Sequence, residues 1–238
     1  MKPLRKTWLE IAPGIPSEPP DDFDYRHLPE PPIRGRQPFV WLLDEVGIDA
    51  KYMEKYGDSR PATYWQEGLA RVEAQANEMG VRLPDGYSEL MRRSDIRDRL
   101  RSPTADSFGI PKVGIVAIPD REGEYLLRFY SDSQSCWHWY IYWDVHGRTC
   151  VVGTPFDFTA GYSYAKYNET AELDGNNPVG GAWDALEEYD DDLENFLFRL
   201  WVGQEAWFRQ TRHNRDTSNL PPSASMYLEG CRGIGKKA

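Results

Sequence analysis

Residues 137–143 constrain the fold more than any other segment, because the run Trp-His-Trp-Tyr-Ile-Tyr-Trp is aromatic or β-branched at almost every position. Such residues favour strands, and the side chains of a strand alternate between its two faces. Both faces are then largely apolar or aromatic, so we predict a central strand packed on both sides; an aromatic face that binds a partner is the alternative. Alternation puts these residues on opposite faces: Trp137, Trp139, Ile141 and Trp143 on one, and Cys136, His138, Tyr140 and Tyr142 on the other.

Three neighbouring segments carry the same strand signature, namely residues 113–118, 125–130 and 149–152. Asp144-Val-His-Gly147 predicts a turn between 137–143 and 149–152. We therefore expect a curved, mostly antiparallel sheet of about four to six strands in the middle of the chain.

Helical periodicity flanks this sheet, which predicts a single α+β domain over residues 39–210. Thr63 and Gln66 form a capping-box pattern at the start of the clearest helix, and Gly80 is expected to end it. Shorter helices are expected after Pro38, with a glycine stop at Gly47, and around residues 87–91 after a proline. A closing helix is expected from Leu186 to about Arg209. The apolar positions of the clearest helix are Trp65, Leu69, Val72, Ala76 and Met79.

Both ends of the chain differ from this domain. Nine of the eighteen prolines fall within residues 1–38, which predicts a proline-rich arm and not a core element. Pro29, Pro32 and Arg34 fit a polyproline ligand pattern, with a plain arm as the alternative. Residues 211–238 are polar and show no periodicity, so we expect a loosely ordered tail.

Composition narrows the partner classes. The chain has 28 Lys and Arg against 38 Asp and Glu, a net charge of -10, which disfavours nucleic acid and anionic membranes. This balance favours a basic protein partner, although it also serves solubility alone. Three cysteines cannot form a disulfide framework, and no apolar run resembles a signal peptide or a membrane span. We therefore expect a cytoplasmic protein.

Two patterns raise the question of catalysis or metal binding. Cys136, His138, His146 and Cys150 are zinc-compatible side chains within fifteen residues. If Trp143 pairs with Arg148, Cys150 points away from Cys136 and His138, and a three-residue turn reverses this, because a slip of one residue moves every side chain to the other face. Buried cysteines with a turn histidine are the alternative, and we expect no metal or cofactor.

A second pattern, Gly161-Tyr-Ser-Tyr-Ala165, weakly resembles a nucleophile elbow. The surrounding sequence is typical of a loop, and only His213 follows as a candidate base. A hydrolase with Ser163 as nucleophile therefore stays a minor alternative, and no catalytic residue is assigned.

The densest charged feature is a run of seven acidic residues between Asp184 and Glu194. Acids near a helix N-terminus stabilise the helix dipole, which is one interpretation. The other interpretation is an acidic patch that docks a basic partner, with aromatic anchors supplying affinity. On that interpretation the partner-binding residues are Glu187, Glu188, Asp190, Asp191, Asp192, Trp139 and Tyr142.

Three segments resemble the SUKH superfamily, which includes fungal cell-wall assembly and killer-toxin-resistance regulators and bacterial immunity proteins. The first is Val72-Glu-Ala-Gln-Ala-Asn-Glu-Met-Gly-Val-Arg-Leu-Pro-Asp-Gly-Tyr87. The second is Phe129-Tyr-Ser-Asp-Ser-Gln-Ser-Cys-Trp-His-Trp-Tyr140, which leads through Asp144 and Gly147 to Val151. The third is Leu193-Glu-Asn-Phe-Leu-Phe-Arg-Leu-Trp201. Together they place the resemblance over roughly residues 63–209, most of the chain.

The resemblance implies an α+β fold with helices beside a curved sheet, and a non-enzymatic protein that works by binding another protein. An immunity-like protein that neutralises its partner is the first expectation, and charge suggests a basic toxin as that partner. A regulatory scaffold in cell-wall or stress signalling, with the proline arm recruiting partners, is the alternative. The resemblance transfers no site residues.

Overall fold

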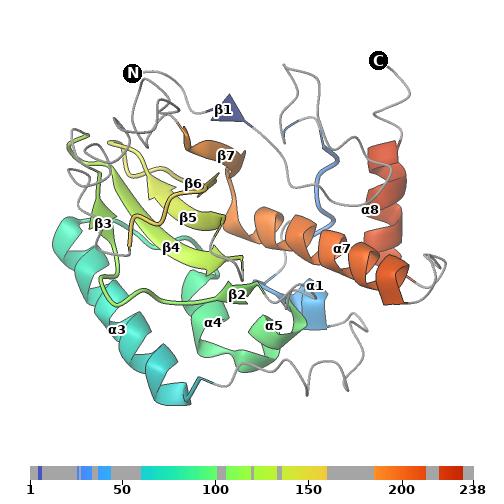
Figure 1. Ribbon diagram of the computed structural model, residues 1–238, viewed down its shortest axis with the longest axis horizontal. Helices are drawn as coiled ribbons and strands as arrows, with labels where there is room; N and C mark the ends of the chain where they lie inside the picture. The colour runs from blue at the N-terminus through green and yellow to red at the C-terminus, as the bar shows by residue number, and fades with distance from the viewer. Residues whose placement is uncertain are drawn as a thin grey trace.

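The α+β class is confirmed by the computed structural model, which describes residues 5–6, 26, 28–33, 37–43, 60–100, 106–118, 121–132, 136–159, 185–212 and 220–232. Helices pack beside one mostly antiparallel sheet (Figure 1). The helices are α1 (Val40–Leu43), α3 (Ala62–Met79), α4 (Tyr87–Arg92), α5 (Ser94–Arg99), α7 (Leu193–Arg212) and α8 (Pro222–Arg232).

The sheet has seven strands in the order β1-β7-β6-β5-β4-β2, with β3 pairing only with β4. It exceeds the expected four to six strands because β1, β2 and β3 are two-residue strands that join its margins. All pairings are antiparallel except that of β1 with β7. The strands are β1 (Arg5–Lys6), β2 (Ser107–Phe108), β3 (Val116–Ala117), β4 (Tyr125–Ser131), β5 (His138–Trp143), β6 (Thr149–Thr154) and β7 (Glu187–Asp190).

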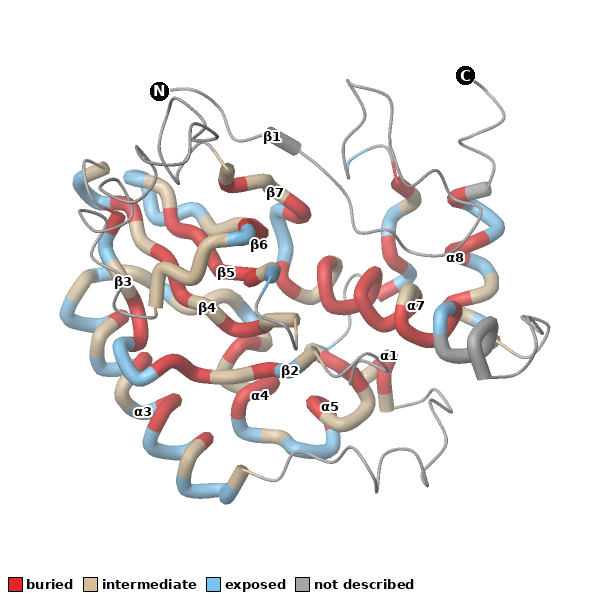
Figure 2. The backbone as a smooth tube through the Cα atoms, viewed as in Figure 1, coloured by how far each residue is buried: buried red, intermediate tan, exposed pale blue. Residues whose placement is uncertain are grey.

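Strand β5 lies at the centre of the sheet and is buried at all six positions, which confirms the predicted central strand (Figure 2). Trp139, Ile141 and Trp143 belong to the main core, on the face that the helices cover. Tyr140 and Tyr142 belong to a second, smaller core on the opposite face. Side chains on the two faces of β5 therefore belong to two separate apolar cores.

The predicted turn at Asp144–Gly147 is present, and it sets the register of β6. Gly147 has φ 72°, and the Asp144 carboxylate accepts hydrogen bonds from the backbone N–H groups of His146 and Arg148 at 2.8 and 2.9 Å. Trp143 pairs with Thr149, not with Arg148, so Cys150 lies opposite Tyr142. This is the register in which Cys150 shares a face with His138.

Two helix boundaries differ from expectation in instructive ways. Gly80 ends α3 in the left-handed conformation with φ 68°, as predicted. The capping box is wrong, because extended Pro61 occupies the N-cap position and Thr63 lies inside the first turn with no side-chain cap. The closing helix begins at Leu193 and not at Leu186, because residues 187–190 pair with β6 as a strand.

The described parts of both chain ends differ from the prediction. Leu28 and Ile33 lie in the main core, so the expectation that the arm contributes nothing to the core is wrong for these two residues. The tail forms α8, whose apolar residues recur at helical spacing and face α7. They are Ala224, Tyr227, Leu228 and Cys231. Arg34 lies outside the described residues.

The segment expected as a strand over 113–118 forms only the two residues of β3. Gly114 has φ 69°, and the Gln75 side chain binds the backbone of Val113 and Ile115, so the chain bends toward α3 before it can pair. None of the helices within the described ranges is long and apolar enough to cross a membrane.

Gly153 on β6 offers a test of this packing. A Cβ atom there would lie 2.6 Å from the indole nitrogen of Trp137 and 2.6 Å from a ring carbon of Tyr189. We expect Gly153→Ala to lower the free energy of unfolding by about 1–3 kcal/mol in urea titrations, because the crowded rings must move. Gly147→Ala, where a Cβ meets nothing within 4 Å, is the control and should cost only the backbone strain of about 1 kcal/mol. Equal losses would contradict the crowding.

Candidate functional site

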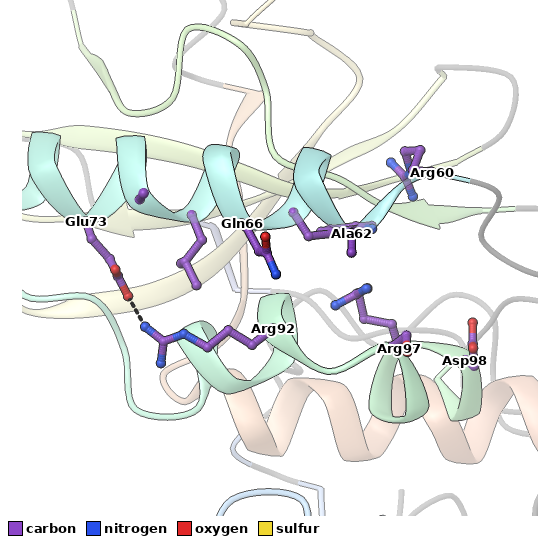
Figure 3. Close-up of a pocket in the computed structure, with 11 residues that line it drawn as sticks. Arg60, Ala62, Gln66, Glu73, Arg92, Arg97 and Asp98 are labelled. Carbon is purple, nitrogen blue, oxygen red and sulfur yellow. Dashed lines mark hydrogen bonds and ion pairs between the residues drawn. The ribbon is translucent and has the colours of Figure 1, made fainter.

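A half-open groove of about 730 Å³ lies between α3 on one side and α4 and α5 on the other (Figure 3). We call it the α3–α5 groove. Its α3 side contains Ala62, Gln66 and Ala70, which are exposed and spaced four residues apart, so they form one row along the helix. Its other side contains Arg92, Ser94, Arg97 and Asp98.

Two guanidinium groups contact the indole of Trp65 at one end of the groove. The Arg97 guanidinium carbon lies 3.7 Å from the Trp65 ring centroid, and that of Arg60 lies 4.6 Å from it. Arg97 is buried and donates to the carbonyl oxygens of Leu90 and Met91 at 3.0 and 2.6 Å. Cation–π contact and carbonyl hydrogen bonds therefore fix these charges in place.

An ion pair closes the opposite end. Arg92 donates to a carboxylate oxygen of Glu73 at 2.6 Å, which links α4 to α3, and the Ser88 hydroxyl donates to the same oxygen at 3.0 Å. Figure 3 shows Glu73 and Arg92 at one end of the groove and Arg60, Arg97 and Asp98 at the other. The groove therefore has the Arg92–Glu73 ion pair at one end and two arginines with Asp98 at the other.

Helix α3 is tied to the segment between β2 and β3, so the groove is preformed. The Tyr64 hydroxyl donates to the Ile110 carbonyl at 3.0 Å and accepts from the Ile110 N–H at 3.1 Å. Gly68 leaves room for Ile110, since a Cβ on Gly68 would lie 3.1 Å from the Cβ of Ile110. The position of α3, and with it the groove, is set by packing against residues forty positions away in sequence.

The predicted partner-binding residues do not form one surface. Trp139 and Tyr142 lie on opposite faces of β5 in different cores, at 8% and 6% exposure. Glu187 and Glu188 are partly buried on β7, between β1 and β6. The remaining three are Asp190, which is the last residue of β7, and Asp191 and Asp192, which lie between β7 and α7.

Of these three acids, Asp191 and Asp192 are exposed, whereas Asp190 is 1% exposed and forms an ion pair with Arg199. Arg199 also donates to the Tyr227 hydroxyl at 2.9 Å, which ties β7, α7 and α8 together. Asp190 is therefore a structural anchor and does not lie on the expected surface patch. Burial raises the pKa of the Asp190 carboxyl to about 7, against the opposing charge of Arg199.

The described residues show no arrangement of side chains that supports the zinc pattern, and the two hydrolase candidates are not among them. Within the part of the chain that the structure describes, no group of three or more His, Cys, Asp or Glu side chains is arranged to hold a metal ion. His138 is 1% exposed, and its Nδ1 lies 3.1 Å from the Ser131 hydroxyl on the neighbouring strand. Ser163 and His213 lie outside the described residues.

The groove itself was missed from sequence. Periodicity predicts that Trp65 and Leu69 are core residues, which is correct, but it does not indicate that the exposed row beside them borders a groove. Small residues at Ala62 and Ala70 on an otherwise polar face are the one signal that suggests an open surface. Arg60 precedes α3, whereas Arg92 comes from α4 and Arg97 from α5, and no local pattern specifies the place of these two helices beside α3.

The chain matches no protein-family model, no curated protein and no solved structure. The likeness to the SUKH superfamily therefore stays a resemblance of the three quoted segments.

The raised pKa of the Asp190 carboxyl predicts that the stability of the fold depends on pH. Because its folded-state pKa is about 7 and its ordinary value is 3.8, the folded protein binds this proton more tightly than the unfolded chain. Its stabilising contribution is full below pH 4 and is lost as the pH rises through 7, at up to about 1.4 kcal/mol per pH unit. We expect the difference in unfolding free energy between the wild type and Asp190→Asn to shrink over that window. A difference that grows with pH would contradict the raised pKa.

Proposed function

We propose that this protein is a non-enzymatic, SUKH-type binding module that acts as an immunity-like protein and neutralises another protein by direct contact. The observation that carries the proposal is the preformed α3–α5 groove. The proposal includes a cytoplasmic location, which the three free cysteines favour.

The residue types of the groove suit protein recognition. Tryptophan and arginine dominate binding hot spots, since they combine apolar area with directional hydrogen bonds. Trp65, Arg60 and Arg97 are already held by internal contacts, so binding costs little side-chain entropy. The exposed row of Ala62, Gln66 and Ala70 leaves the groove open to a partner's chain.

A second docking site is favoured by a separate observation. Asp191 and Asp192 are exposed immediately before α7, which offers a basic partner two carboxylates. This alternative keeps the basic toxin expected from net charge, with a smaller site than the sequence suggested.

Filling the groove tests the proposed function. Ala70→Trp places an indole in the groove from an exposed position, so we expect the protein to fold normally and to lose its specific partner at least tenfold in quantitative pull-downs from native lysate. Ala74→Trp, also exposed on α3 but outside the groove lining, is the matched control and should keep the partner. Equal recovery by both variants would move binding away from the groove, and no saturable partner at all would refute the function.

The acidic alternative has its own test. We expect Asp191→Asn with Asp192→Asn to leave stability within about 0.5 kcal/mol, because both side chains are exposed. If a basic partner is lost from this double variant and kept by Ala70→Trp, the site lies before α7. Asp190 stays unchanged in this experiment because its loss would unpair buried Arg199.

A further inference from the structure

Residues 28–33 of the proline-rich arm pack against the C-terminal helix α8. Leu28 and Ile33 are buried in the main core. The ring of Pro29 lies so close to Gly230 of α8 that a Cβ atom on this glycine would be 2.9 Å from the Cγ atom of the proline. Two segments from opposite ends of the chain therefore contact each other directly.

Helix α8 is itself held in place by α7 (Figure 1). The rings of Phe198 and Tyr227 meet edge to face with their centroids 5.3 Å apart, and the Tyr227 hydroxyl accepts a hydrogen bond from Arg199 at 2.9 Å. Arg199 is buried and pairs with Asp190 at the end of β7. The arm therefore packs on a helix whose position is fixed by the rest of the domain.

The packed arm presents only one of the two prolines that fit the polyproline ligand pattern. A polyproline II helix has three residues per turn, so in that conformation Pro29 and Pro32 lie on one edge and enter an aromatic-lined groove together. In this structure Pro32 is exposed, whereas Pro29 is half-buried against α8, and residues 32–33 form a turn. A polyproline-binding groove therefore cannot take both prolines while the arm is packed.

We infer that Pro29 and Pro32 form a ligand for a polyproline-binding domain, and that α8 masks this ligand until the arm is released. Residues 28–33 belong to no helix or strand, so their release breaks no sheet pairing. The masked ligand binds more weakly than a free one, in proportion to the fraction of molecules in which the arm is released. This second binding site lies apart from the α3–α5 groove and goes beyond the proposed function.

Gly230→Leu tests the masking. The new side chain has no room beside Pro29, and a helix accepts leucine better than glycine, so the change displaces the arm without weakening α8 itself. Glu229→Leu, at the neighbouring exposed position of α8, is the matched control. Release of the arm is measured by hydrogen exchange and mass spectrometry of the peptide that contains Leu28 and Ile33. Peptides from the sheet report whether each full-length variant is folded.

Binding is measured against a panel of purified SH3, WW and EVH1 domains, with a synthetic peptide of residues 26–36 as the unmasked reference. We expect at least one domain to bind this peptide and to bind the wild-type protein about tenfold more weakly. Gly230→Leu should bind nearly as tightly as the peptide, and Glu229→Leu should bind as the wild type does. Adding Pro29→Ala and Pro32→Ala to Gly230→Leu should abolish the binding.

Other outcomes overturn the inference. A wild type that binds as tightly as the peptide would exclude masking, and a peptide that binds no domain of the panel would exclude the ligand. Faster exchange of the arm in Gly230→Leu without tighter binding would do the same. If Gly230→Leu does not fold, Leu28→Ala removes one core anchor of the arm, leaves both prolines in place and gives the same test. The pull-downs with Ala70→Trp do not depend on these results, so the proposed function is judged separately.

Discussion

The burial of β5 on both faces is the constraint on which the rest of the structure depends. Six consecutive residues with large side chains are withdrawn from water, so each face needs its own apolar cover. The helices provide it on one face, and Leu126, Val152 and Leu186 contribute to it on the other. A bulge in β4 after Arg128 turns both Phe129 and Tyr130 toward the helical side, which enlarges the main core.

Polar side chains then fix the positions of the covering helices. The indole N–H of Trp143 on β5 donates to the Arg82 carbonyl at 2.8 Å, so the central strand directly holds the turn between α3 and α4. Gln204 on α7 donates to the Tyr130 hydroxyl at 2.9 Å, which ties that helix to β4. The turn between α3 and α4 is thus attached to the sheet, and the Arg92–Glu73 ion pair and the Arg97–Trp65 contact join the two sides of the groove.

The tertiary structure gives different roles to acidic residues that lie close together in the sequence run ending at Glu194. Asp190 is committed to Arg199, and Glu194 accepts hydrogen bonds from the Phe39 N–H and the Trp41 indole at 2.8 and 2.9 Å. Burial raises the pKa of Glu194, and these donors oppose that effect. Asp192 is exposed, but it accepts a hydrogen bond from the Asn195 N–H at 2.9 Å in the first turn of α7. Asp190, Asp192 and Glu194 therefore all have structural roles, and Asp191 and Asp192 are the exposed acids of the described part of the run.

The sequence by itself determined the α+β class, the central strand, the turn at Asp144 and the end of α3 at Gly80, because each depends on local backbone preference or on strand alternation. Only the tertiary structure decided that residues 187–190 are a strand. The spacing of three between Leu186 and Tyr189 fits a helix, and it also fits an extended segment whose side chains enter two different cores. It also decided the groove, because Trp65 and Arg97 meet through the packing of α3 against α5 and no periodicity within either helix specifies that distance.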